Sequence, residues 1–200
     1  MNILILGAGA IGSHLAYCLD NNKNNIVLIT KKKYLKNLKK NGINLKIFSN
    51  DQFKKKVIIK ENNRIEFQSD LPEVCKNYKN KFDAIFIAVK LKDFSLGVIK
   101  KITKLVNKNT GLILPCTYLP PWWFFGLFKS NKINQSLLEA KFLKKFQKNM
   151  IGMTMWLSGK IEKPGTVRIS HIQRGFPLKE VFSKFKLKAD LLRKDIKKKC

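Results

Sequence analysis

The feature that most constrains this chain is a glycine-rich turn between an apolar run and a helical pattern. Residues 2–6 are almost wholly apolar, which predicts a strand buried on both faces. Residues 7–12 read Gly-Ala-Gly-Ala-Ile-Gly, and apolar side chains then recur at helical spacing up to residue 19. A second apolar run, residues 26–29, follows an Asn-rich turn. This order is typical of an α/β, Rossmann-like, doubly wound domain with a mostly parallel sheet.

The spacing of the glycines indicates a turn that binds phosphate. Gly7 permits a tight turn, Gly9 has no Cβ to obstruct a pyrophosphate, and Gly12 lets the helix pack closely on the strand. The N-terminus of the helix adds free N–H groups and a partial positive charge. A glycine-rich turn without a ligand is the alternative. The candidate dinucleotide-binding residues here are Gly7, Ala8, Gly9, Ala10, Ile11 and Gly12.

The residues after the second strand predict which dinucleotide is bound. NAD-binding folds usually carry an acid there, which accepts hydrogen bonds from the ribose hydroxyls. This chain has Thr30 followed by Lys31, Lys32 and Lys33, and no acid. A lysine attracts a 2′-phosphate that a carboxylate would repel, so we expect NADP(H) rather than NAD(H), with Lys31 as the first candidate. The alternative is three more lysines in a lysine-rich chain.

A further candidate follows the strand predicted over residues 82–89. Lys90 stands at the carboxyl end of that strand, where the ligand crevice of an open α/β sheet lies. A solvated lysine is the alternative. Other apolar patterns predict shorter strands over 43–48, 57–60, 64–67, 112–116, 150–157 and 167–170, and helices over 34–41, 96–106 and 135–148.

We interpret the formal net charge of +28 as a bias in amino-acid composition rather than as a sign of a negatively charged partner. Lys and Arg number 41 against 13 Asp and Glu, and only Arg64, Arg168, Arg174 and Arg193 are arginines. Nucleic-acid faces normally use more Arg, because its fork contacts phosphates and bases bidentately. Aromatic residues cluster in 120–128, away from most of the charge. We therefore expect no nucleic-acid partner.

Membrane and metal classes are also disfavoured. The longest apolar run, residues 120–128, is shorter than the roughly 18 to 20 residues of a spanning helix, and no signal peptide is visible. The histidines are far apart and no CxxC pair occurs, so no metal site is expected. The scattered cysteines are read as reduced thiols in a cytoplasmic protein: Cys18, Cys75, Cys116 and Cys200.

Several segments together resemble the ketopantoate reductases (2-dehydropantoate 2-reductases). The resemblance covers nearly all of residues 1–192. It rests on the start of the chain with its three glycines, the Lys31 region, residues 83–90, the Pro-Trp-Trp-Phe-Phe of 121–125, Ile151-Gly152, Ser158 and the turn at 164–167. The order and spacing of these motifs carry the likeness.

The resemblance implies an NADPH-dependent oxidoreductase that reduces ketopantoate to pantoate, in pantothenate and coenzyme A biosynthesis. It implies that residues 7–12 bind the pyrophosphate, that Lys31 binds the 2′-phosphate, and that Lys90 and Ser158 line the cofactor site. It also places Tyr118 in that site, where the family usually has an Asn that contacts the cofactor. The implied partner is a small 2-keto acid, and the sequence leaves a homodimer open.

The family carries its proton-donating lysine in a C-terminal helical domain, expected beyond residue 200. We therefore expect residues 1–192 to form the NADP-binding domain and 193–200 to begin the first helix of a truncated C-terminal domain. The chain by itself is expected to be inactive. The alternatives are a free-standing NADP(H)-binding module without catalysis and a nucleic-acid binder.

Overall fold

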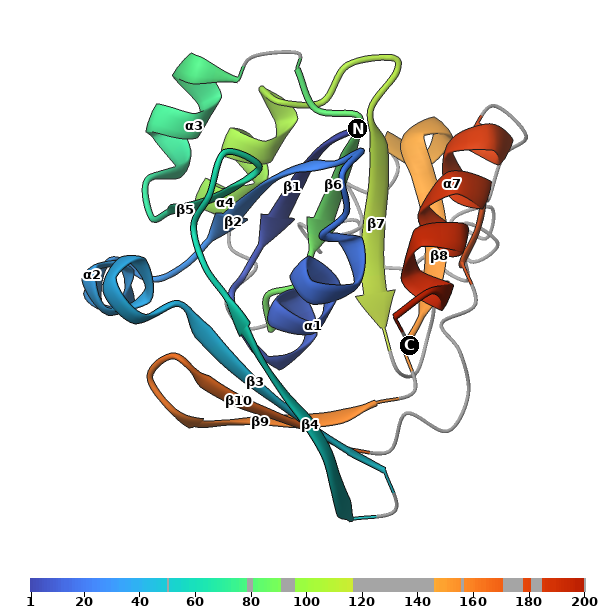
Figure 1. The fold of residues 1–200 in the computed structure, drawn as a ribbon. Helices are drawn as coiled ribbons and strands as arrows, with labels where there is room; N and C mark the ends of the chain where they lie inside the picture. Colours follow the sequence, from blue (N-terminus) through green and yellow to red (C-terminus); the bar gives the residue numbers. More distant parts are fainter. Residues whose placement is uncertain are drawn as a thin grey trace, which may run out of the picture.

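The computed structural model describes residues 1–49, 51–78, 81–90, 96–116, 146–155, 157–170, 178–180 and 185–199. Within these residues the strands form two sheets. Sheet A has the order β11-β8-β7-β6-β1-β2-β5, and sheet B has the order β4-β3-β10-β9. Helix α1 lies between the two sheets (Figure 1) and contacts strands of both. No helix in the described part of the chain is long and apolar enough to cross a membrane.

Sheet A is parallel except at one edge. Its strands are β1 (Asn2–Leu6), β2 (Asn25–Ile29), β5 (Ile65–Gln68), β6 (Ala84–Ile87), β7 (Gly111–Cys116), β8 (Met150–Thr154) and the antiparallel β11 (Leu178–Glu180). The helices are α1 (Ala10–Leu19), α2 (Lys32–Asn41), α3 (Leu71–Asn77), α4 (Leu96–Thr103), α7 (Lys186–Lys197) and the short η2 (Gln147–Asn149). The Rossmann-like α/β fold expected from the sequence is confirmed.

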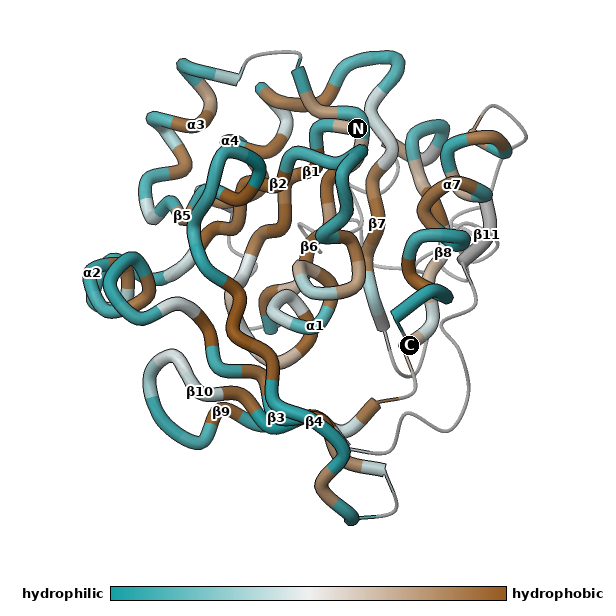
Figure 2. The backbone as a smooth tube through the Cα atoms, in the orientation of Figure 1, coloured by the Kyte–Doolittle hydropathy of each residue, from teal (hydrophilic) through white to brown (hydrophobic). Residues whose placement is uncertain are grey.

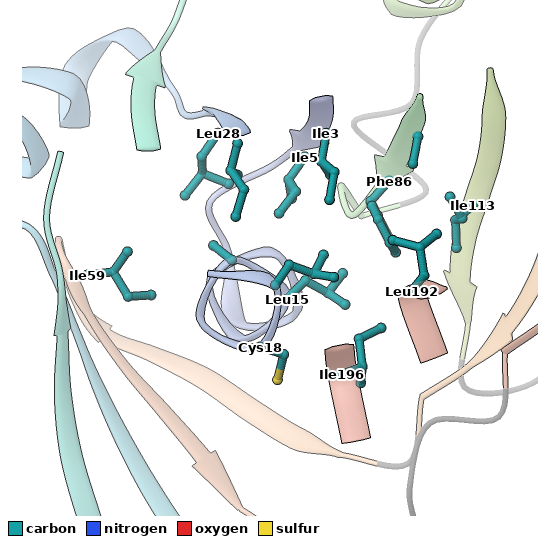
Figure 3. Packing of buried hydrophobic residues seen from close by; sticks show 14 of the residues in the cluster. Ile3, Ile5, Leu15, Cys18, Leu28, Ile59, Phe86, Ile113, Leu192 and Ile196 are labelled. Atoms are coloured by element: carbon teal, nitrogen blue, oxygen red, sulfur yellow. The ribbon is translucent and has the colours of Figure 1, made fainter. Parts of the chain in front are cut away.

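Two apolar layers cover sheet A because successive residues of a strand face opposite sides. Ile3 and Ile5 of β1 pack in a core with α1 and α7. Figure 3 shows Ile3 and Ile5 above Leu15 of α1, and Leu192 of α7 beside Phe86 and Ile113. Leu4 and Leu6 pack in a second core with side chains of α3 and α4. Residues 3–6 are therefore apolar at every position, which is why they form one continuous apolar run.

Helix α7 closes the α1 side of the core. Its buried residues Ala189, Leu192 and Ile196 fall at helical spacing, and they pack in the same core cluster as Leu15. The domain boundary expected between residues 192 and 193 falls inside this helix, with buried side chains on both sides of it. Residues 186–197 thus form one continuous helix on the Rossmann-like domain.

Sheet B is a smaller, mostly antiparallel layer. Its strands are β3 (Ile43–Ser49), β4 (Gln52–Ile59), β9 (Ser158–Lys163) and β10 (Thr166–Ser170), with β3 and β10 paired in parallel. Ile43, Leu45 and Ile47 of β3 are buried and alternate with more exposed residues. The tube of Figure 2 shows a matching alternation in hydropathy along β3, as brown and teal segments. One face of sheet B thus belongs to the core around α1.

Sequence patterns did not predict all of the observed strands and helices. Strand β4 begins at Gln52 rather than near residue 57, and β9 was not predicted, because all six of its residues are exposed and carry no apolar alternation. Helix α3 was also missed, since only Leu71 and Val74 of its seven residues are buried. The predicted helix over 135–148 and the aromatic segment 120–128 lie wholly or mostly outside the described residues.

Candidate functional site

The glycine turn lies where the carboxyl ends of three strands of sheet A meet. The backbone N–H of Gly7 donates to the carbonyl of Ile29 at the end of β2, over 3.1 Å. The N–H of Ala88, just after β6, donates to the carbonyl of Leu6 over 2.9 Å. Gly7 has φ = +112°, a conformation that side-chain-bearing residues rarely adopt. The turn is therefore held by backbone bonds at the edge where ligands of open α/β sheets bind.

Two glycines of this turn differ in what surrounds them. A Cβ on Gly12 would lie 1.8 Å from the carbonyl oxygen of Gly7, so α1 can pack on the turn only without a side chain there. A Cβ on Gly9 would meet nothing within 4 Å. The space above Gly9 is open, and a bound group can approach its backbone closely. This is the arrangement that a dinucleotide pyrophosphate requires.

The electrostatics of α1 favour an anion at the same place. Gly9 is the N-cap of α1, without a side-chain cap, and the first turn of the helix carries no acidic residue. The N–H groups of Ala10, Ile11 and Gly12 have no acceptor within the helix, because the first turn of any α-helix leaves them without one. The partial positive charge at this end is thus not offset by a carboxylate of the first turn.

Lys31 lies where the sequence predicted it, at the end of β2. It follows Thr30, is exposed, and is the N-cap of α2, whose first turn contains Lys32 and Lys33 and no acid. The Gly7–Ile29 hydrogen bond joins this strand end to the glycine turn. The positive charge of Lys31 therefore stands at the strand end next to the glycine turn, and its role toward a 2′-phosphate stays a prediction.

The other predicted site residues are placed as follows. Lys90 is exposed and follows the end of β6, the strand on the other side of β1. Ser158 begins β9, and its neighbour Gly159 lies against α1, since a Cβ there would come 2.8 Å from the Cβ of Ala10. Strand alternation puts Ser158 on the opposite face of sheet B from Gly159. Tyr118 lies outside the described residues.

A small pocket beside the glycine turn was not predicted. It has a volume of about 20 Å³, room for about one water molecule, and its lining includes Ala8, Thr30, Tyr34 and Ile161. Pro164 and Gly165 of the turn after β9 also line it, and the Asn37 side-chain amide donates to the carbonyl of Pro164 at 3.1 Å. Ile161 comes from a strand without an apolar pattern, so nothing in the sequence placed it here.

Comparison with solved structures gives the same fold. A candidate ketopantoate reductase from Ralstonia solanacearum MolK2 matches with a TM-score of 0.69 at 20% identity. The 2-dehydropantoate 2-reductase from Geobacter metallireducens GS-15 matches with a TM-score of 0.66 at 16% identity. A D-mandelate dehydrogenase, solved with NADH and anilino(oxo)acetate, matches with a TM-score of 0.62 at 19% identity. At these identities the likeness is one of fold.

The match spans nearly all of this chain and little more than half of the others. Each of the three comparisons covers 98% of this chain, but only 58%, 56% and 54% of the Ralstonia, Geobacter and mandelate dehydrogenase chains. No curated protein matches the sequence.

The family model of the ketopantoate reductases PanE/ApbA matches residues 3–115. That range is more than half of the 200 residues, and it contains the glycine turn, Lys31, Lys90 and strands β1 to β6. The chain therefore belongs to the ketopantoate reductase PanE/ApbA family.

Proposed function

We propose that this chain binds NADP(H) at the glycine turn, as the cofactor domain of an oxidoreductase that reduces a 2-keto acid, with ketopantoate as the first candidate. The family match and the fold neighbours support an oxidoreductase of this type. The observation that carries the proposal is the contrast between Gly12, where a Cβ would collide with Gly7, and Gly9, where it would enter open space. If position 9 required glycine only for folding, other atoms of the chain would lie close to it, as they do at Gly12.

Each group of the proposed site has a separate task. The N–H groups of residues 10–12 would donate to the pyrophosphate at the N-terminus of α1. The ammonium group of Lys31 would pair with the 2′-phosphate, and Lys90 would approach the cofactor from the end of β6. The reduced nicotinamide supplies a hydride when it is bound. The chain's own part is to hold the dinucleotide at the sheet edge.

The dinucleotide preference rests on Lys31. One fold neighbour was solved with NADH, so this fold does not by itself choose between the two dinucleotides. The 2′-phosphate adds about two negative charges. The ammonium group of Lys31 attracts them, and so does the partial positive charge at the N-terminus of α2. The direct neighbours of Lys31 are Thr30 and Lys32, so no carboxylate stands there to accept hydrogen bonds from the ribose hydroxyls of NADH. We therefore expect the phosphorylated cofactor to bind more tightly.

Turnover needs more than this site. The proton donor of the family's reaction is expected outside these 200 residues, and the chain spans only 54% to 58% of its solved neighbours. Reduction of the keto group requires a proton for the developing alkoxide and a substrate held close to the hydride donor. We accordingly expect these 200 residues by themselves to bind the cofactor without reducing substrate.

Calorimetric titration with NADPH and NADH tests the proposal. We expect the wild-type chain to bind NADPH at least about tenfold more tightly than NADH. The Lys31→Ala variant should lose this preference, with its affinity for NADH unchanged. Lys36→Ala is the matched control, because Lys36 is an exposed lysine farther along α2. Equal binding of both cofactors to the wild-type chain would contradict the role of Lys31. Oxidation of NADPH on addition of ketopantoate would contradict the expected lack of turnover.

A further inference from the structure

Sheet B has a second face, opposite to the one that packs around α1. Its inner face carries the buried residues of β3 and β10 that pack around α1. The alternate residues of the four strands point the other way. This outer face comprises Asn44, Lys46 and Phe48 of β3, Phe53, Lys56 and Ile58 of β4, Arg168 and Ser170 of β10, and Ser158, Lys160 and Glu162 of β9.

The strand register places four basic residues in one row across the outer face. Lys56 of β4 is paired with Lys46 of β3, Lys46 with Arg168 of β10, and Arg168 with Lys160 of β9. Neighbouring strands lie about 4.8 Å apart, so the row spans roughly 14 Å. Like charges directly opposite each other destabilise a sheet. A row of four cations therefore lowers the stability of sheet B unless anions lie against it.

Carboxylates of the chain offset only part of this charge. The ammonium group of Lys46 lies 2.7 Å from the carboxylate of Glu162, and the Arg168 guanidinium lies 3.4 Å from that of Asp51. Asp51 is itself largely exposed, so its attraction for Arg168 is screened by solvent. Among the described residues, four cations thus face two carboxylates. The whole chain has a formal net charge of +28, which adds to the positive potential at this face.

Two aromatic rings lie beside the basic row. The rings of Phe48 and Phe53 meet edge to face at 5.6 Å, and the guanidinium of Arg168 lies 4.0 Å above the centre of the Phe48 ring. Phe53 is 58% exposed, a large value for a phenylalanine on a sheet. The outer face thus combines an accessible ring, a stacked arginine and a line of cations.

We propose that the outer face of sheet B binds single-stranded nucleic acid. The row of Lys56, Lys46, Arg168 and Lys160 would contact successive phosphates, and a base would stack on the exposed ring of Phe53. Base–aromatic stacking requires unpaired bases, because those of a duplex are already stacked on one another. A polyanion without bases could use the basic row but not the ring. The combination therefore favours a single strand over a duplex and over other polyanions.

This inference departs from the sequence-based expectation of no nucleic-acid partner. That expectation rested on the small number of arginines and on aromatic residues that cluster in 120–128, away from most of the charge. Folding supplies such a surface, because Phe48 and Arg168 lie far apart in the sequence but on adjacent strands of sheet B. The surface is separate from the glycine turn, so its test does not depend on cofactor binding.

The test is fluorescence anisotropy with a labelled thymidine oligonucleotide of about 12 nucleotides. The Phe53→Ala chain keeps its charge, so it separates stacking from the general attraction of a basic protein for polyanions. We expect it to bind the oligonucleotide about 5- to 100-fold more weakly than the wild type, with an unchanged salt dependence. The matched control is Leu187→Ala, which removes an exposed apolar side chain from α7, with 75% of Leu187 exposed. Circular dichroism confirms that both variants are folded.

Two further measurements complete the test. Lys56→Ala should reduce the slope of log binding constant against log salt by about one relative to Lys36→Ala on α2. A heparin fragment, which has charge but no bases, should bind the wild type and Phe53→Ala equally. The proposal is overturned if Phe53→Ala binds the oligonucleotide like Leu187→Ala, if a duplex of the same length binds as tightly as the single strand, or if the wild type does not bind.

Discussion

The carbonyl oxygen of Gly7 lies 1.8 Å from the point that a Cβ on Gly12 would occupy. Two residues five positions apart are thus in contact through backbone atoms, and α1 begins directly against the end of β1. This contact fixes the direction of the helix N-terminus relative to the sheet. Between these two residues, a Cβ on Gly9 would meet no atom within 4 Å.

We expect Gly12→Ala to destabilise the fold by at least about 3 kcal/mol, because either the backbone of Gly7 or the whole of α1 must move to admit a methyl group. Urea denaturation followed by circular dichroism measures the loss. A variant whose free energy of unfolding lies within about 0.5 kcal/mol of the wild type would show that α1 is not packed on the turn as described.

The buried side chain of Asn24 joins the start of β2 to α7. Its amide donates to the carbonyl of Leu19 and to the carboxylate of Asp195, each at a distance of 3.0 Å. Asn24 is only 2% exposed. Asn24→Ala should lower the free energy of unfolding by about 2 kcal/mol, because the buried carbonyl of Leu19 loses its side-chain donor. Asp190→Ala is the control. It breaks an exposed pair with Arg193 and should cost less than about 1 kcal/mol.

Equal effects of the Asn24→Ala and Asp190→Ala substitutions in the same urea titration would contradict the role given to Asn24. The two losses in the free energy of unfolding should differ because of burial. Water can hydrate the Arg193 side chain when its exposed partner is removed, but it cannot reach the buried carbonyl of Leu19.

Tyr78 is expected to make the stability depend on alkaline pH. Its hydroxyl donates a 2.5 Å hydrogen bond to the carboxylate of Glu66, which together with burial raises the pKa of Tyr78 from 10.0 to about 12. The folded state thus holds this proton more tightly than the unfolded state does. The contribution of Tyr78 is fully present below pH 10 and is lost as the pH rises through about 12.

Unfolding free energies of the wild type and Tyr78→Phe, measured across this pH range, isolate that contribution. The difference between the two should shrink as the pH rises through about 12. Absorbance of the tyrosinate ion should show one fewer late-titrating group in Tyr78→Phe. A difference between Tyr78→Phe and the wild type that does not change with pH would contradict the hydrogen bond to Glu66.

The core of sheet A could be predicted from local sequence because its strands are buried on both faces. Residues 2–6, 26–29 and 112–116 each form a continuous apolar run, and each corresponds to a strand. The glycine turn was predictable for a similar reason, since all its parts lie within a few residues. The positions of Lys31 and Lys90 followed from the ends of the strands predicted over residues 26–29 and 82–89.

The strand pairing of sheet B could not be predicted from local sequence patterns. Strand β9 has no buried residue, and it is held in place by pairing with β10 and by the contact of Gly159 with α1. The parallel pairing of β3 with β10 joins segments that are distant in the chain. The pocket at Ile161 and the row of cations across the outer face both depend on this register. No apolar period or short motif records such a pairing.

The measurement that tests the central claim most directly is NADPH binding by Gly9→Ala. A Cβ at this position meets no atom of the chain within 4 Å, so the variant should fold and unfold like the wild type. The same Cβ would occupy the space assigned to the pyrophosphate. We therefore expect the Kd for NADPH to rise by at least about 30-fold, about 2 kcal/mol, with the free energy of unfolding unchanged. Wild-type affinity for NADPH in a folded Gly9→Ala chain would contradict the claim that this turn holds the cofactor.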